Sequence, residues 1–223
     1  MNPKPPPVVA IDGPSGSGKG AVSQRLATKL GWRYLDSGSL YRMVALAAAR
    51  TAVPAEDAEA LAKIAAGLDI KFLPGGRILL GNEDVSDAIR SQECSRLASQ
   101  VAALAPVRRA LLQKQHNLRQ PPGLVADGRD MGTIVFPDAL FKVFLTANPE
   151  VRAARRYKQL KEKGFDVNLP RLLGEIRERD ARDAGRAASP LRPADGAHHL
   201  DTSAMSIAEV VEYIYGCLPE SLK

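Results

Sequence analysis

Short apolar runs alternate with longer amphipathic stretches along most of this chain, and the two patterns predict strands and helices respectively. Strands that alternate with helices form parallel sheets with helices on both faces, so this order predicts an α/β protein. We expect five parallel strands in a three-layer core. The predicted strands are residues 8–11, 33–35, 124–126, 141–145 and 199–200, and the predicted helices lie near 19–30, 39–50, 91–104, 106–119, 149–163, 168–184 and 206–217.

Residues 68–85 depart from this alternation. Their alternating runs are joined by Pro74-Gly75-Gly76 and by Gly81-Asn82, residues that favour tight turns. The segment therefore predicts a hairpin or a small three-stranded antiparallel unit. It is too short to fold as an independent domain, so we expect a lobe inserted into the core.

The size and composition are those of a globular protein with one core. Of the 223 residues, 45% are hydrophobic and 25% are charged. No apolar run approaches the roughly 20 residues of a membrane span, and residues 1–7 lack the apolar stretch of a secretory signal. Cys94 and Cys217 match neither a disulfide framework nor a metal-binding spacing. We therefore expect a cytoplasmic protein with a flexible tail at residues 1–7 and no membrane partner.

The net charge of +6 and the isoelectric point near 9.4 favour anionic partners. Aromatic residues make up only 5% of the chain, and the basic residues form no uninterrupted tract. The arginines stand at separated points instead. This distribution favours a small polyanionic ligand that is bound from several sides, and we expect no nucleic acid.

Residues 13–19, GPSGSGK, form the strongest chemical motif of the chain. They match the G-x-x-x-x-G-K frame of a phosphate-binding loop. A β-branched run precedes them, and a helix with Val22 and Leu26 on its apolar face follows. The glycines let backbone N–H groups converge on an anion, while the helix N-terminus and Lys19 add positive charge. The motif therefore predicts a polyphosphate site.

The motif departs from the usual frame at Gly20, because a Ser or Thr hydroxyl that binds Mg²⁺ commonly follows the lysine. A glycine there resembles the nucleoside monophosphate kinases, in which Mg²⁺ is held largely through water and the nucleotide phosphates. In those kinases a hydroxyl residue often follows the glycine, whereas Ala21 has none. No residue is assigned as a metal ligand.

Polar residues follow four of the five predicted strands. The carboxyl ends of parallel strands lie at one edge of the sheet, where ligands bind. We therefore expect these residues beside the glycine-rich turn. Arg42, one turn into the helix that follows, can point to the same edge as a second anion-binding group. The four stretches are Asp12-Gly13, Asp36-Ser37-Gly38, Asp127-Gly128-Arg129-Asp130 and Thr146-Ala147-Asn148.

The helix predicted at 168–184 is apolar only in its first half. Asn168 is a candidate N-cap, Pro170 lies in the first turn, and Gly185 is a candidate C-terminal stop. After Ile176, the sequence RERDARDAGR offers no apolar side chain to bury.

Two interpretations of this arginine-rich half remain open. Arg179, Asp183 and Arg186 are four and three residues apart, so they share one face if helical geometry continues to residue 186. An exposed helix stabilised by ion pairs such as Glu178–Arg182 is one interpretation. The other is a mobile lid that places arginines over phosphates, which the glycine-rich turn favours.

Together these stretches resemble the bacterial cytidylate kinases, a type of nucleoside monophosphate kinase. The resemblance runs from about residue 8 to residue 215 and implies a three-layer P-loop kinase fold in a single domain. It also implies a monophosphate-binding insert at about 38–120 and a helical lid at about 155–187. The matching stretches are IDGPSGSGKG (11–20), LDSGSLYR (35–42), SQVAA (99–103), ADGRDMGTIVFPDA (126–139), EKGFDVN (162–168) and ERDARD (178–183).

This resemblance implies direct in-line transfer of the γ-phosphoryl group from ATP, with Mg²⁺, to CMP or dCMP in pyrimidine nucleotide metabolism. It implies ATP contacts at Gly13, Pro14, Ser15, Gly16, Ser17, Gly18, Lys19, Gly20 and Ala21, and a donor base near the arginines of 152–156. It implies cytosine contacts at Ser37, Arg108 and Asp130, and ribose contacts at Ser99, Arg179 and Asp183. The acceptor or transferring phosphate would be held by Arg42, Arg129 and Arg186. The resemblance further implies Tyr41 as a CMP-site residue and a catalytic set of Lys19, Arg42, Arg129, Arg179 and Arg186.

Other functions remain open from the sequence. A kinase of UMP, AMP or shikimate would share the fold, and the preference among CMP, dCMP and UMP, or between ATP and GTP, is not set by these motifs. A switch GTPase would need a guanine-binding N-K-x-D motif, which the sequence lacks, and a hydroxyl in place of Gly20. A nucleic-acid-binding module would bind with a steep salt dependence. We expect a monomer.

Overall fold

The computed structural model describes residues 5–73, 76–162 and 164–222. Pro74 and Gly75 of the expected turn lie outside the described residues, as do residues 1–4 of the expected tail and residue 163 within the expected lid. The chain divides into two compact units. Unit 1 comprises Met1–Leu35 and Leu118–Lys223, and unit 2 comprises Asp36–Asn117.

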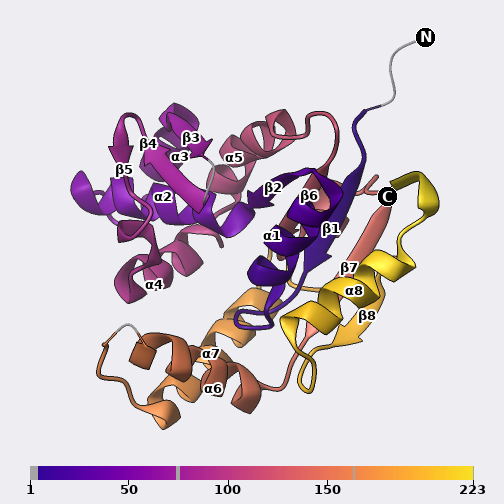
Figure 1. Cartoon of the computed structure of the whole chain (residues 1–223). Coiled ribbons are helices and arrows are strands. Elements are labelled where there is room, and N and C mark those ends of the chain that lie inside the picture. Colours follow the sequence, from indigo (N-terminus) through magenta and orange to yellow (C-terminus); the bar gives the residue numbers. More distant parts are fainter. Residues whose placement is uncertain (1–4, 74–75, 163, 223) are drawn as a thin grey trace. The chain divides into compact units, whose positions relative to one another are not determined.

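Unit 1 is built on a five-stranded sheet in the order β2-β6-β1-β7-β8 (Figure 1). The central strand β1 pairs in parallel with β6 and with β7, and all of its residues are buried. A strand covered on both faces requires a continuous apolar run, which VVAI supplies. The five-stranded parallel sheet predicted from the sequence is confirmed. The strands are β1 (Val8–Asp12), β2 (Arg33–Asp36), β6 (Leu124–Gly128), β7 (Phe141–Thr146) and β8 (His198–Asp201).

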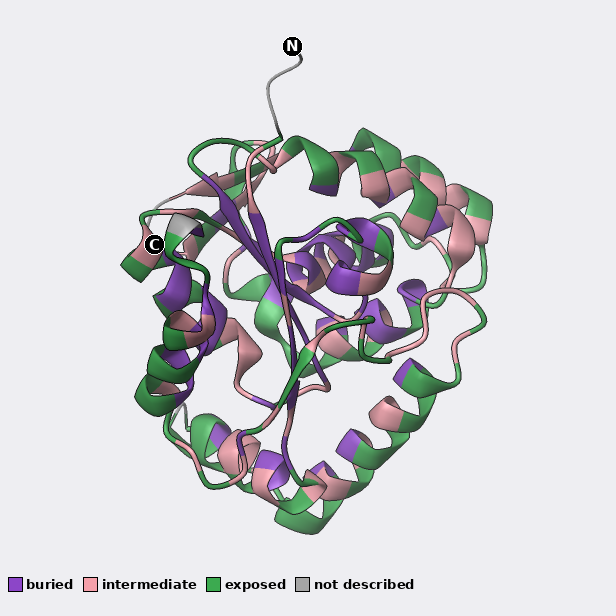
Figure 2. Cartoon of the chain, turned by 90° about the vertical axis from the view of Figure 1, so that its right-hand side faces the viewer, coloured by how far each residue is buried: buried purple, intermediate pink, exposed green. Residues whose placement is uncertain are grey.

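The helices of unit 1 pack with their apolar faces inward, as the burial colours of Figure 2 show. Helix α1 contacts both α8 and β6, and α6 packs against α7. Val22 and Leu26 of α1 belong to the same buried cluster as Ile11 of β1 and Ile214 of α8. None of the helices within the described residues is both long enough and apolar enough to cross a membrane. The elements are α1 (Lys19–Leu30), α6 (Pro149–Glu162), α7 (Leu169–Ala184), α8 (Ile207–Cys217), a turn of π-helix η3 (Met131–Val135) and η4 (Glu220–Leu222).

The strand register places the polar ends of the central strands at one edge of the sheet. Asp12, the last residue of β1, lies opposite Gly128 of β6 and Phe144 of β7. Because these strands are parallel, the segments that follow them leave the sheet at the same edge. The glycine-rich turn, Arg129 and Asp130, and residues 147–148 therefore begin beside one another.

Unit 2 combines helices with a small antiparallel sheet of order β3-β4-β5. This sheet confirms the antiparallel unit predicted near residues 68–85. Helix α2 packs against α4, and α3 packs against α5. The elements are α2 (Ser37–Arg50), α3 (Ala58–Gly67), β3 (Ile70–Leu73), β4 (Arg77–Leu80), β5 (Glu83–Asp84), η2 (Ala88–Arg90), α4 (Gln92–Val101) and α5 (Ala105–Asn117).

Candidate functional site

The glycine-rich turn has backbone angles that require glycine. Gly13, Gly16 and Gly18 have φ values of 154°, 80° and 91°, and a Cβ at Gly13 would lie 2.2 Å from the carbonyl oxygen of Leu145. Gly18 is the N-cap of α1 and has no side chain to occupy the first N–H groups of the helix. These N–H groups and the positive end of the helix dipole are therefore suited to bind an anion.

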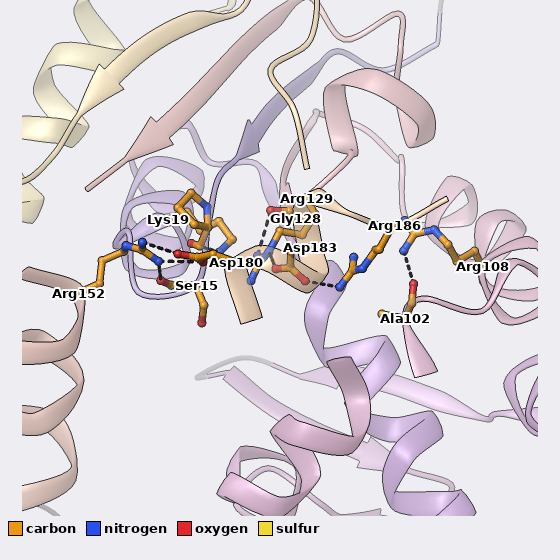
Figure 3. Close-up of polar contacts among 11 residues, drawn as sticks. Ser15, Lys19, Ala102, Arg108, Gly128, Arg129, Arg152, Asp180, Asp183 and Arg186 are labelled. Carbon is orange, nitrogen blue, oxygen red and sulfur yellow. Dashed lines mark hydrogen bonds and ion pairs between the residues drawn. The ribbon is translucent and has the colours of Figure 1, made fainter. Parts of the chain in front are cut away.

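Lys19 lies at the start of α1, and its side chain returns to the turn. Its Nζ donates to the carbonyl oxygen of Pro14 at 3.1 Å (Figure 3). The side chain is only partly buried, so it is not needed to fill the core. A primary ammonium on a flexible stem can exchange this carbonyl for a phosphate oxygen without a change of fold.

Two polar side chains lie beside Gly20. A Cβ at this position would lie 3.4 Å from Oδ2 of Asp127 and 3.6 Å from the hydroxyl of Tyr34. That hydroxyl donates to Oδ2 of Asp127 at 2.8 Å. Across the described ranges, no three His, Cys, Asp or Glu side chains come together in a way that could hold a metal ion. A lone carboxylate beside a phosphate site nevertheless fits Mg²⁺, which keeps water and phosphate oxygens as most of its ligands.

Asp12 is a buried carboxyl group that holds the start of η3. Its Oδ1 accepts from the backbone N–H of Met131 and its Oδ2 from that of Gly132, both at 2.8 Å. Burial raises the pKa of Asp12 to about 6, although the two N–H groups lower it. The negative charge of Asp130 raises this pKa further, and the positive charge of Lys19 lowers it. Asp12 thereby fixes the segment that follows Arg129 and Asp130.

We expect the Asp12 carboxyl to make protein stability depend on pH in an unusual direction. Because its pKa is raised from 3.8 to about 6 on folding, its contribution to stability is full below pH 3.8 and is lost as the pH rises to about 6. We therefore compare the unfolding free energy of the wild type with that of Asp12→Asn. The wild-type value minus the variant value should fall by about 2–3 kcal/mol between about pH 4 and pH 7. Urea titrations of both proteins across this range measure the difference, and a constant difference would contradict the prediction.

Asp183 of α7 is the centre of an arginine cluster. Its side chain is fully buried, and its Oδ2 accepts from Nε of Arg129 at 2.7 Å. Its Oδ1 accepts from Arg186, which lies three residues further on and is also buried (Figure 3). Nη1 of Arg129 reaches the carbonyl oxygen of Gly128 at 3.3 Å. The cluster thus links the end of β6 to the last turn of α7.

The arginines lower the pKa of Asp183 although burial acts against them. Burial alone would raise this pKa, and the positive charges of Arg129, Arg186 and Arg179 outweigh it. The carboxylate therefore stays ionised at neutral pH. Arg179 and Asp183 lie on α7, whereas Arg186 follows its C-cap Gly185, so the helix ends before Arg186. Both arginines nevertheless act on the Asp183 carboxylate.

Arg152 and Arg155, two of the arginines expected near the donor base, bind other parts of unit 1. Arg152 donates to the carbonyl oxygen of Ala147. It also donates to the carbonyl oxygen of Ser15 and forms a double ion pair with Asp180 (Figure 3). Arg155 donates to the carbonyl oxygen of Thr202 at 2.5 Å. Both side chains therefore serve contacts within the protein.

The site residues expected in unit 2 lie mainly on α2, α4 and α5. Arg42 is 3.4 Å from the carboxylate of Asp36, which also caps α2 by accepting from the N–H of Ser39. The guanidinium of Arg108 lies over the ring of Tyr41 with 5.3 Å to its centroid, and it donates to the carbonyl oxygen of Ala102 at 2.9 Å.

Ser37 and Ser99 are buried hydroxyl residues of the same unit. Ser37 is the first residue of α2, so the helix begins two residues earlier than predicted. The hydroxyl of Ser99 in α4 finds no hydrogen-bond partner among the residues that the structure describes. A buried polar atom without a partner commonly binds a ligand or a water molecule.

The structure thus gathers the predicted residues into separate groups. In unit 1, Arg129 and Arg186 both bind Asp183, whose pKa Arg179 also lowers, and residues 13–19 form the turn before α1. Asp130 follows β6 and precedes η3. Ser37, Tyr41, Arg42, Ser99 and Arg108 belong to unit 2. Tyr34 carried no sequence motif, and Asp127 and Asp180 belonged to matching stretches of the resemblance without a role of their own.

The parallel sheet and the glycine-rich turn between β1 and α1 define a P-loop kinase fold. The family model described as cytidylate kinase matches residues 9–219. A cytidylate kinase of Shewanella denitrificans (strain OS217) is 57% identical over 93% of this chain and 94% of its own. One from Stutzerimonas stutzeri (strain A1501) is 57% identical over 95% and 94%. The chain belongs to the cytidylate kinase family.

Proposed function

We propose that the protein transfers the γ-phosphoryl group of ATP to CMP and dCMP, forming ADP with CDP or dCDP. Membership of the cytidylate kinase family carries this proposal. The glycine-rich turn and the arginine cluster around Asp183 support it, because phosphoryl transfer between two nucleotides needs binding groups for both sets of phosphates. A kinase of UMP or AMP is not favoured by the family match.

The chemistry needs no general base. A phosphate monoester has a second pKa of about 6, so the acceptor is already mostly a dianion at neutral pH. The protein's task is to align the two nucleotides in line and to neutralise charge on the transferring group. We assign this task to Lys19, Arg42, Arg129, Arg179 and Arg186.

The remaining roles are proposed residue by residue. Residues 13–21 hold the phosphates of ATP, and Ser37, Arg108 and Asp130 bind the cytosine ring. Ser99, Arg179 and Asp183 bind the ribose, and the partnerless hydroxyl of Ser99 supports this role. Tyr41 stacks against Arg108 and supports its orientation. Residues of about 155–187 act as a lid, and the active form is a cytoplasmic monomer.

We assign Asp127 to Mg²⁺, and Tyr34 to the orientation of Asp127. Bound Mg²⁺ neutralises phosphate charge during the transfer. The carboxylate of Asp127 occupies the space beside Gly20 where other phosphate-binding loops carry a hydroxyl. The hydrogen bond from Tyr34 to Oδ2 fixes the orientation of this carboxylate.

We expect Asp127→Asn to raise the Mg²⁺ concentration needed for half-maximal activity by about 10-fold, because loss of one carboxylate weakens metal attachment. Ala21→Thr should leave that concentration unchanged, because Asp127, and not residue 21, is the residue that would hold the metal. Initial rates across a Mg²⁺ titration at fixed ATP measure both variants. A fall in the Mg²⁺ requirement of Ala21→Thr would show that a hydroxyl at this position binds the metal.

A panel of acceptors tests the proposed reaction. ADP release from ATP is measured with each ribonucleoside monophosphate and its deoxy form. We expect CMP and dCMP to give the highest kcat/KM. Higher kcat/KM with UMP or AMP would contradict the proposal, and binding to DNA or RNA that weakens steeply with salt would favour a nucleic-acid-binding module.

A further inference from the structure

The guanidinium of Arg152 joins three segments of unit 1 that are distant in sequence. Its Nε donates to the carbonyl oxygen of Ala147 at 2.8 Å, just after β7, and its Nη1 donates to that of Ser15 at 3.1 Å, in the glycine-rich turn. Nη1 and Nη2 bind the two carboxylate oxygens of Asp180 on α7 at 3.0 and 2.6 Å (Figure 3). Such a planar group, bound in several directions, fixes its neighbours more narrowly than a single ion pair does.

This group is shielded from water. The side chain of Arg152 is 4% exposed and that of Asp180 is 26% exposed. An exposed ion pair also joins α6 and α7, because Arg177 lies 2.7 Å from Glu150. Arg152 therefore differs from the surface arginines of α7 in both burial and partners.

Thr202 holds a second carbonyl of the turn in the same way. Its hydroxyl lies 2.9 Å from the carbonyl oxygen of Ser17 and 3.0 Å from that of Thr146, so these two carbonyls share its one proton, and Arg155 binds the Thr202 hydroxyl and carbonyl. In a trans peptide the C=O and the following N–H point in opposite directions. Carbonyls of Ser15 and Ser17 that are bound from outside the turn therefore direct the N–H groups of Gly16 and Gly18 toward its interior.

The partner of Arg152 lies on the helix that also carries Asp183, the centre of the arginine cluster. Asp180 is three residues before Asp183, and both belong to α7. Asp180 binds the arginine that holds Ser15, whereas Asp183 binds Arg129 and Arg186. One helix is thus connected to both groups of phosphate-binding residues.

We propose that Arg152 and Asp180 are positioning residues that set the orientation of the phosphate-binding N–H groups in the glycine-rich turn. Through them, α7 aligns the donor phosphates with the arginines that receive the transferred group. This inference rests on the phosphate-binding role proposed for residues 13–19. It assigns Arg152 to the phosphates of the donor, through the backbone of Ser15, in place of the donor base.

The test compares Asp180→Asn and Arg152→Lys with the control Glu150→Gln, which breaks an exposed pair between the same helices. Calorimetry measures the affinity for ATP, for CMP and for inorganic tripolyphosphate, which has no base and no sugar. We expect both variants to bind ATP and tripolyphosphate about 10-fold more weakly, because the N–H groups lose their alignment. CMP affinity and all affinities of the control should stay within about two-fold of the wild type.

Four outcomes would overturn the proposal. Variants that bind tripolyphosphate as the wild type does show that the pair does not orient the turn. Weaker binding of ATP alone would assign Arg152 to the base. Equal losses in Glu150→Gln, or for CMP, would show a general effect on α6 and α7. If the wild type binds CMP but not tripolyphosphate, the phosphate-binding role proposed for the glycine-rich turn is wrong. That result is distinct from the other three, which concern only the Arg152–Asp180 pair.

Discussion

Lys19→Ala is expected to lower kcat about 10³-fold, or by about 4 kcal/mol in activation free energy, because the ammonium stabilises charge that develops on the transferring phosphoryl group. The melting temperature should change little. The side chain is partly buried and its Nζ bonds to the carbonyl of Pro14, so its loss opens no cavity in the core. A coupled ADP-release assay at saturating ATP and CMP measures kcat, and thermal unfolding measures stability.

Lys29→Ala is the matched control, because it removes the same side chain from the other end of α1. Lys29 binds Glu212 at 2.6 Å on the surface, and such exposed pairs contribute about 0–1 kcal/mol to stability. Its kcat should equal that of the wild type. Near-normal turnover in Lys19→Ala would contradict the role given to the glycine-rich turn.

The fold was predictable wherever apolar residues recur with a clear period. All five strands of the parallel sheet were found within one or two residues of their ends. The three central strands β1, β6 and β7 are buried apolar runs bounded by polar residues, whereas the outer strands β2 and β8 are largely exposed and were indicated by their place in the alternation with helices. Helix α3 was missed. Its sequence AEALAKIAAG is rich in alanine, and only Leu61 and Ala65 are buried, so its apolar face is narrow. The Asp57 side chain, which caps the helix by accepting from the N–H of Ala60, was the signal available.

The site was predictable where its residues are close in sequence. The glycine-rich turn is one continuous motif whose geometry follows from its glycines. The contacts around it depend on the tertiary fold instead. Tyr34 and Asp127 are 93 residues apart, and Arg152 and Asp180 are 28 residues apart. The turn η3 is held by Asp12, which is 119 residues before Met131, so no local pattern indicates it.

The arginine cluster explains how a buried carboxylate can belong to a phosphate site. Arg129, Arg179 and Arg186 all lower the pKa of Asp183, so three guanidinium groups face one carboxylate. Asp183 thus fixes the positions of the arginines that we propose bind the acceptor phosphate.

Asp183→Ala is expected to weaken acceptor binding far more than ATP binding. The variant loses the proposed ribose contact and releases Arg129 and Arg186 from a fixed carboxylate. KM for CMP should rise by more than about 10-fold, and KM for ATP should stay within about three-fold. Stability should fall by about 3–5 kcal/mol, because two largely buried guanidinium groups lose their partner. Steady-state kinetics with each substrate varied in turn, and urea unfolding, measure these changes.

The pH dependence of stability separates the charge of Asp183 from its packing. The pKa of Asp183 is lowered on folding from its ordinary value of 3.8. Its charge therefore stabilises the fold above pH 3.8, and this stabilisation is lost as the pH falls through the lowered pKa of the folded state. The difference in unfolding free energy between the wild type and Asp183→Asn should therefore be largest at neutral pH and shrink in acid. Glu178→Gln, on the exposed face of α7 beside Arg182, is the control and should show little effect. Equal losses of CMP and ATP affinity in Asp183→Ala would refute the ribose role, since a specific acceptor contact cannot weaken both nucleotides alike.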